Sequence, residues 1–210
     1  MKELTEEYIE QILSGNSENL NLEFKGSFDF ISNIWAREKL IRAILAMSNT
    51  RNGGYIVVGI EQKDDKSVDF SGIEAGHLTI FKSKEEDLKS KVESFSSSPV
   101  NYEISYGRFQ NKDFILINVS EFNLSFIICK KKGDHKTDKI LEEGSIYVRT
   151  LKDKPSSVKL IDPDDIQDLF KRAVDKQIVD LHSRGWNHKT ETIVDQDALF
   201  GKERSDFFKE

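Results

Sequence analysis

The sequence predicts a single α/β domain of the α+β type, in which helices flank a mixed, largely antiparallel sheet of about five or six strands. Segments with helical apolar spacing are interspersed with short alternating or continuously apolar runs that are typical of strands. Hydrophobic residues make up 37% of the 210 residues and aromatic residues 10%, which is enough apolar surface for one core. We therefore predict a domain over residues 1–182, followed by a polar tail or docking segment over 183–210.

Local patterns place the elements along the chain. The predicted helices cover residues 4–13, 32–48, 83–95 and 162–181. The predicted strands cover residues 20–25, 55–60, 102–106, 114–119, 125–129 and 145–149. Side chains that can accept a hydrogen bond from a helix N-terminus precede three of the helices. These predicted caps are Ser32, the Ser83/Glu86 pair, and Asp162 followed by Pro163.

Composition limits the compartment and the cofactors. Cys129 is the only cysteine, so the chain has no internal disulfide and no cysteine pair to hold zinc. The N-terminus lacks the apolar stretch of a signal peptide, and no segment approaches the roughly 18 apolar residues that span a bilayer. We expect a soluble cytoplasmic protein with no membrane partner.

The charge distribution indicates that a polyanion could bind only at particular basic stretches of the chain. The net charge of −6 argues against general binding to polyanions, because phosphate binding depends largely on lysine and arginine. Basic residues nevertheless gather in one stretch at Lys130, Lys131 and Lys132 and recur at Arg149. Such runs are most often solvated surface, and a phosphate-binding surface is the alternative.

The tripeptide Glu23-Phe24-Lys25 is the sharpest local feature. On a strand, residues two apart project from the same face, so a carboxylate and an ammonium group can lie around one phosphate. An ordinary salt bridge explains the pair equally well. Glu18 precedes it, and Glu61 follows the next predicted strand, so three carboxylates could meet at one edge. Such a cluster is a candidate site for Mg²⁺ or Mn²⁺.

Five sequence blocks in a fixed order resemble the Schlafen AlbA-like domain, a family associated with nucleic-acid binding and, in some members, with RNA cleavage. The likeness extends from about residue 17 to residue 169. The blocks cover residues 17–25, 43–50, 53–61, 72–73 and 144–149.

The resemblance implies a metal-dependent endonuclease that prefers structured RNA such as tRNA. Glu18, Glu23 and Glu61 would hold Mg²⁺ or Mn²⁺, and Lys25 would assist at the scissile phosphate. At Glu61 the family usually has aspartate, and the extra methylene alters the metal geometry. Lys130, Lys131, Lys132 and Arg149 would contact nucleic acid. Because full Schlafen cores contain two related lobes, a single copy implies a homodimer.

The rival hypothesis is a non-catalytic DNA- or RNA-binding module, or a protein-interaction scaffold. Other chemistries have less support in the sequence. The four histidines lack ligand or triad spacing, and Cys129 lies in an apolar run that favours packing. Gly53-Gly54 lacks the lysine and hydroxyl residue of a P-loop and is interpreted as a turn.

Overall fold

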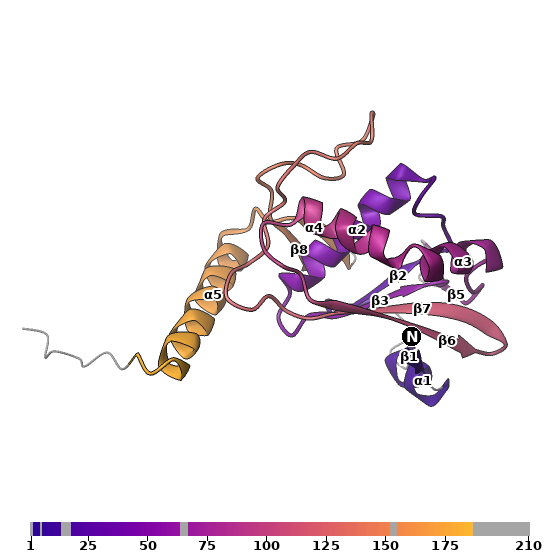
Figure 1. Cartoon of the computed structure of the whole chain (residues 1–210), viewed down its shortest axis with the longest axis horizontal. Coiled ribbons are helices and arrows are strands. Elements are labelled where there is room, and N and C mark those ends of the chain that lie inside the picture. Colours follow the sequence, from indigo (N-terminus) through magenta and orange to yellow (C-terminus); the bar gives the residue numbers. More distant parts are fainter. Residues whose placement is uncertain (1, 5, 14–17, 64–66, 152–154, 187–210) are drawn as a thin grey trace, which may run out of the picture.

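The computed structural model describes residues 2–4, 6–13, 18–63, 67–151 and 155–186 and confirms a mixed α/β fold (Figure 1). A five-stranded sheet has the order β1-β6-β7-β3-β2. Its strands are β1 (Lys2–Leu4), β2 (Leu22–Lys25), β3 (Gly54–Val58), β6 (Tyr102–Phe109) and β7 (Lys112–Val119). The helices are α1 (Glu6–Leu13), α2 (Ile34–Ser48), α3 (Ala75–Ser83), α4 (Glu85–Phe95) and α5 (Pro163–Ser183).

Two short antiparallel ladders lie outside the central sheet. One pairs β4 (Glu61–Gln62) with β5 (Val68–Asp69), and the other pairs β8 (Tyr147–Thr150) with β9 (Ser156–Lys159). Within the central sheet the two outer pairs, β1–β6 and β2–β3, are parallel, whereas β6–β7 and β3–β7 are antiparallel. The mixed pairing agrees with the prediction. Among the described strands, antiparallel pairs are two of the four in the central sheet and four of the six when both ladders are included.

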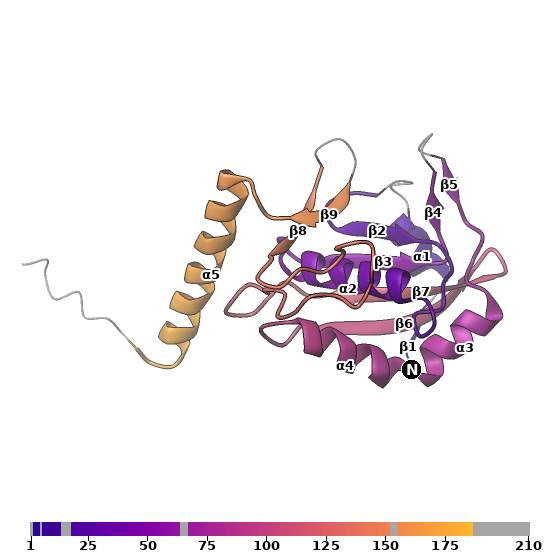
Figure 2. The ribbon, with the colours of Figure 1, turned by 90° about the horizontal axis from the view of Figure 1, so that it is seen from above.

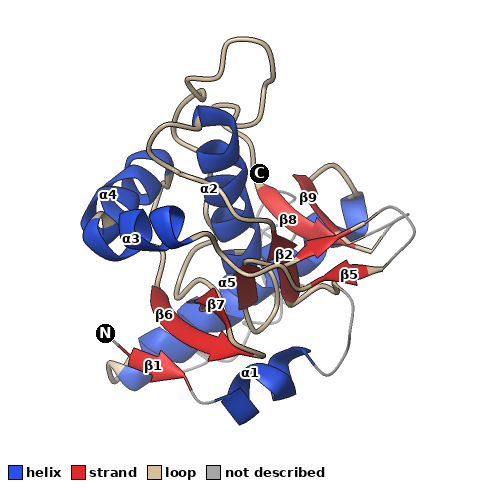
Figure 3. Ribbon diagram, turned by 90° about the vertical axis from the view of Figure 1, so that its right-hand side faces the viewer, coloured by secondary structure: helices blue, strands red, loops and turns tan. Residues whose placement is uncertain are grey.

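Helices α2, α3 and α4 lie on one side of the sheet and α1 lies on the other (Figures 1 and 3). Buried apolar side chains form one cluster on each side. Strand side chains alternate between faces, so Ile56 and Val58 of β3 join the core beneath α2, while Val57 joins the layer beside α1. Helix α2 is buried over more than one face, as its apolar sequence predicts. Its fully buried side chains include Leu40, Ile41, Ile44 and Met47.

The segment 125–129 is not a strand, contrary to the prediction. It forms only isolated bridges, Ser96 with Cys129 and Ile128 with Ile146. The buried amide of Asn49 satisfies the backbone of Ile127, accepting from its N–H at 2.7 Å and donating to its carbonyl at 2.9 Å. A side chain thus replaces the neighbouring strand that the prediction assumed.

The predicted strand 145–149 corresponds to β8, but β8 pairs with β9 and does not join the central sheet. Helix α3 was not predicted as a separate element.

Two of the three predicted helix caps are wrong. Asn33, not Ser32, caps α2, since its side chain accepts from the Ala36 N–H at 3.0 Å. Helix α4 begins at Glu85 without a side-chain cap, because Ser83 belongs to the end of α3. Asp162 caps α5 as predicted, with Pro163 in the first turn. The predicted stop at Gly15 lies outside the described residues.

Helix α5 extends away from the sheet (Figure 2). Only Leu169 and Ala173 of this 21-residue helix are buried. The predicted segment 183–210 lies mostly outside the described residues, which end at Trp186. Of the helices in the described part of the chain, none combines the length and apolar character needed to cross a membrane.

Candidate nucleic-acid interface

Glu23 lies on β2 as a buried carboxylate surrounded by donors. One oxygen accepts from Arg149 Nη1 at 2.7 Å and from Ser157 Oγ at 2.9 Å, and the other pairs with Lys25. Burial acts to raise the pKa of Glu23, but the charges of Lys25 and Arg149 outweigh it, so this pKa is lowered. Both oxygens of an ionised Glu23 are therefore already engaged by protein groups.

Arg149 lies on β8 with only 1% of its side chain exposed. Besides Glu23, its guanidinium donates to the carbonyls of Asn19 at 2.9 Å and Leu22 at 3.1 Å. These bonds attach β8 to β2. The guanidinium of Arg149 is thus engaged by protein groups inside the fold, and its predicted contact with nucleic acid stays a prediction.

Glu18 caps the start of β2. Its Oε1 accepts from the Phe24 N–H at 2.7 Å. Burial raises the pKa of Glu18; the bond from Phe24 opposes this effect, and the charge of Glu23 adds to it. Glu18 is thus close to Glu23, but its carboxylate accepts a hydrogen bond from the backbone of β2.

Glu61 begins β4 and is exposed. Its carboxylate lies beside the β2–α2 connection, where a Cβ added at Gly26 would be 3.6 Å from Oε2. Across residues 2–4, 6–13, 18–63, 67–151 and 155–186, no group of three His, Cys, Asp or Glu side chains is arranged to hold a metal ion. The structure brings Glu18 and Glu23 together, yet does not assemble a three-carboxylate site with Glu61.

A cationic cluster beside this network was missed in the sequence. Lys39 and Arg42 lie three residues apart on α2, and they share one side of the helix. Burial lowers the pKa of Lys39, and the nearby charges of Arg42 and Lys25 lower it further. Lys25, Lys39 and Arg42 form what we call the α2 cation cluster.

The cluster is neutralised only in part. Lys25 pairs with Glu23, and the charges of Asp138 and Glu23 oppose the lowering of the Lys39 pKa. Among the described residues, no carboxylate forms an ion pair with Lys39 or Arg42, and Nε of Arg42 is buried without a hydrogen-bond partner. The i, i+3 spacing in the sequence could have revealed the pair, but the apolar residues of this segment predict a well-buried helix and drew attention away from its cations.

The lysine-rich loop, residues 130–139, is held on α2 by Glu38. This carboxylate is only 1% exposed and accepts from the backbone N–H groups of Asp134 and His135, the latter at 3.0 Å. Lys130, Lys131 and Lys132 are exposed at the start of the loop. Their exposure is compatible with the predicted contact to nucleic acid, which stays a prediction.

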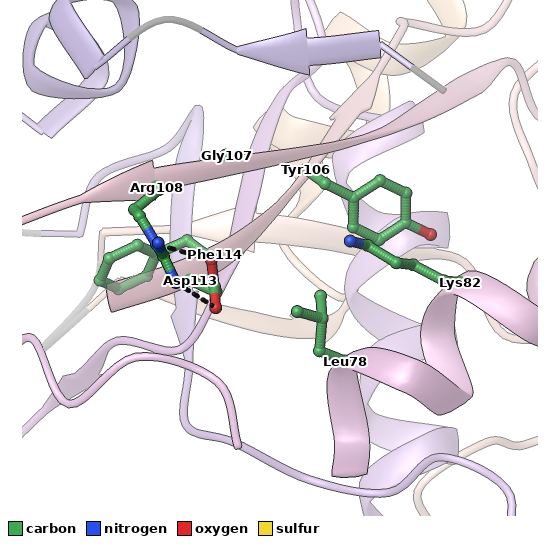
Figure 4. A pocket seen from close by; sticks show the side chains of 7 residues that line it. All are labelled: Leu78, Lys82, Tyr106, Gly107, Arg108, Asp113 and Phe114. Carbon is green, nitrogen blue, oxygen red and sulfur yellow. Dashed lines mark hydrogen bonds and ion pairs between the residues drawn. The ribbon is translucent and has the colours of Figure 1, made fainter. Parts of the chain in front are cut away.

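A pocket of about 290 Å³ lies between α3 and the β6–β7 hairpin (Figure 4). The Lys82 amine lies 5.2 Å from the centroid of the Tyr106 ring, and Arg108 pairs with Asp113 at 3.2 Å. Burial and the neighbouring Glu85 raise the pKa of Tyr106, so the phenol stays neutral. With Arg108 paired to Asp113, Lys82 is the remaining cation of the lining, so the pocket offers a polyanion less positive charge than the α2 cation cluster does.

A larger cleft of about 780 Å³ lies between the C-terminal end of α2 and the start of α5. Its cations are paired: Arg51 contacts Asp168 at 2.5 Å, and Arg172 contacts Asp168 at 2.8 Å and Glu121 at 2.5 Å. These ion pairs leave less charge for an anionic partner than the α2 cation cluster does.

Comparison with protein families shows to which family the chain belongs. A family model described as Schlafen, AlbA_2 matches residues 18–156, which is more than half of the chain and includes β2, α2, the lysine-rich loop and β8. The chain belongs to the Schlafen AlbA_2 family. This membership points to a nucleic-acid-related function. Comparison with curated proteins gave no match.

Two solved structures resemble this Schlafen AlbA_2 domain at low identity. The DIP2311 protein from Corynebacterium diphtheriae is 15% identical, with a TM-score of 0.43, and the match covers 72% of this chain and 25% of that one. This chain thus spans about a quarter of the DIP2311 chain. The N-terminal domain of a RecG-related protein from Nitrosomonas europaea is 17% identical, with a TM-score of 0.41, and the match covers 56% of this chain and 74% of that one.

The metal implied by the Schlafen resemblance does not fit the residues present. Glu23 is engaged on both oxygens, and two cations, Lys25 and Arg149, lie where a divalent ion would need negative charge. Glu18 is committed to a backbone N–H group. We therefore derive no catalytic step through Mg²⁺ or Mn²⁺.

Proposed function

We propose that this Schlafen AlbA_2 domain is a nucleic-acid-binding module whose contact surface is the α2 cation cluster, extended by the lysine-rich loop. The observation that carries the proposal is that Lys39 and Arg42 lie close together without an ion-pair partner among the described residues. Like charges held together are unfavourable alone, and a phosphate backbone relieves their repulsion. For this reason we favour the nucleic-acid-binding module over the two other hypotheses, the metal-dependent endonuclease and the protein-interaction scaffold.

The test is binding of labelled tRNA and of a single-stranded DNA, measured by fluorescence anisotropy at several salt concentrations. Lys39→Gln/Arg42→Gln is expected to weaken binding about tenfold or more at low salt. It is also expected to reduce the slope of log affinity against log salt by about 1.5, because each phosphate contact contributes roughly 0.7 to 0.9.

A control variant removes the same charge elsewhere. Lys171→Gln/Arg184→Gln changes exposed residues on α5 and at its C-terminal cap, and it should bind like the wild type. If both double variants lose affinity equally, the contact is diffuse and the proposed surface is wrong. No binding by the wild type would favour the protein scaffold.

Cleavage is tested on the same tRNA with Mg²⁺ or Mn²⁺. Glu18→Gln is the informative variant, because glutamine can still accept from the Phe24 N–H and preserve the strand. We expect intact tRNA with both proteins. Cleavage by the wild type that Glu18→Gln abolishes would instead support the endonuclease with its preference for structured RNA.

A further inference from the structure

Trp35 is a large aromatic side chain left 40% exposed in the first turn of α2, one helical turn before Lys39. The Lys39 amine lies 3.5 Å from the centroid of the indole ring, and indole Nε1 donates to Asp138 of the lysine-rich loop at 2.9 Å. Trp35 therefore joins the two parts of the proposed interface. Ile31 and Ile34 beside it are also exposed, at 43% and 38%.

The backbone that carries these apolar side chains is fixed before any ligand arrives. Asp29 accepts from the N–H groups of Ile31 at 2.7 Å and Ser32 at 3.2 Å, and Asn33 caps the helix. Arg37 donates to the Ile31 carbonyl at 3.2 Å. A rigid exposed ring loses little conformational freedom on binding, which favours recognition.

The chemistry of this patch combines an aromatic surface with cations on one side. Unpaired nucleobases stack on aromatic rings while lysine and arginine contact the phosphates that link them. In a duplex the bases are stacked on one another, so their faces are not available to Trp35. Lys39 lies over the ring, and Trp35 is still 40% exposed, so we expect a base to stack on the exposed part of the indole.

We propose that Trp35 is a stacking platform for an unpaired nucleobase, which makes the domain selective for single-stranded over double-stranded nucleic acid. This inference rests on the proposed function, because the phosphates must be held by Lys39 and Arg42. The ligand chemistry is the nucleobase face, which single-stranded RNA and single-stranded DNA share.

The experiment compares oligouridine, oligothymidine and a DNA duplex of equal length in anisotropy titrations. Trp35→Leu keeps an apolar side chain beneath Lys39 but removes the ring. It is expected to weaken binding of both single strands about tenfold and to change duplex binding by less than about twofold. Trp35→Phe keeps a ring and should retain most of the single-strand affinity.

Fluorescence supplies a second readout, because Trp35 and Trp186 are the only tryptophans. In Trp186→Phe, oligothymidine is expected to quench the remaining emission; in Trp35→Phe, which retains Trp186, it should leave the emission unchanged. Equal losses for duplex and single strands in Trp35→Leu, or no loss for either single strand, would overturn the platform while leaving the cationic surface in place. Failure of Lys39→Gln/Arg42→Gln to weaken any ligand would instead refute the proposed function.

Discussion

Glu23 and Arg149 form a buried ion pair that holds β8 against β2. Removing one charge from such a pair leaves the other without compensation and typically costs about 3 to 5 kcal/mol. We expect Glu23→Gln to lower the free energy of unfolding by an amount in this range, measured by urea denaturation at neutral pH. Glu23→Leu/Arg149→Met, which removes both charges, should be less destabilised than Glu23→Gln. A Glu23→Gln variant as stable as the wild type would contradict this account.

The same pair predicts a dependence on pH. Because the pKa of folded Glu23 lies below the ordinary value of 4.5, its ionised form contributes stability above that value. The contribution is lost as the pH falls through the lowered pKa and the carboxyl becomes protonated. The difference in unfolding free energy between wild type and Glu23→Gln should therefore be constant near neutral pH and shrink below about pH 4.5.

The sequence predicted the pairing of Glu23 with Lys25 because strand periodicity alone places them on one face. It did not predict Arg149 as the second partner, since that contact joins residues 126 positions apart. It also did not predict that Trp35 would stay exposed and Lys39 half-buried on a helix whose other side chains are mostly buried. Local sequence patterns do not predict contacts between distant residues. They also do not predict which side chains at the edge of a buried helix face remain exposed.

At the scale of elements, Gly133 decides how the lysine-rich loop lies on α2. A Cβ added there would be 2.6 Å from Cδ of Glu38, which is buried and cannot withdraw freely. Gly133→Ala should therefore displace the loop and destabilise the protein by about 1 to 3 kcal/mol. Thermal unfolding measures the loss, and faster hydrogen exchange at the Asp134 and His135 amides would show that the Glu38 contacts are broken.

Gly76 provides the matched control for this substitution. It lies in α3 with no atom within 4 Å of an added Cβ, so Gly76→Ala should be neutral or stabilising by up to about 1 kcal/mol. If Gly133→Ala behaved like Gly76→Ala in both measurements, Glu38 would not be the anchor of the loop.

The elements themselves were predictable to different degrees. Helical periodicity correctly predicted α2, α4 and α5, because in each the apolar residues recur at helical spacing, whether the structure buries them or, as for most of α5, leaves them exposed. The segment 125–129 has the composition of a strand, but its N–H groups bond to Asn49, Ser97 and Ser145. An apolar run predicts that a segment is buried. It does not predict which groups form hydrogen bonds with the N–H and C=O groups of that segment.

At the scale of the whole molecule, a net charge of −6 coexists with two cations on α2, Lys39 and Arg42, that form no ion pair within the described residues. Acidic residues concentrate on other elements, including Glu85, Glu86 and Asp87 in the first turn of α4 and Asp164 and Asp165 in that of α5. This segregation would orient a polyanion toward α2 and repel it from the ends of those helices. Net charge alone is therefore a poor guide to the partner of this domain.

The predicted homodimer remains a proposal, and α5 offers a surface for it. Along this projecting helix, an apolar stripe is exposed at helical spacing, with Phe170 and Val174 each 51% exposed and Ile178 46% exposed. Pairing with a second copy would remove this stripe from water. Val174→Glu places a charge in its centre and should convert a wild-type dimer to a monomer in light scattering coupled to gel filtration.

Asp175→Lys is the control, since the adjacent residue points about 100° away around the helix. It should leave the dimer intact. Neither change alters the α2 cation cluster, so the monomer should bind a short single strand with the affinity of one chain of the wild type. A long strand that contacts both chains of a dimer should bind the monomer more weakly. A wild type that is monomeric at every concentration would refute the homodimer; a dimer that survives Val174→Glu would place the contact elsewhere on the molecule.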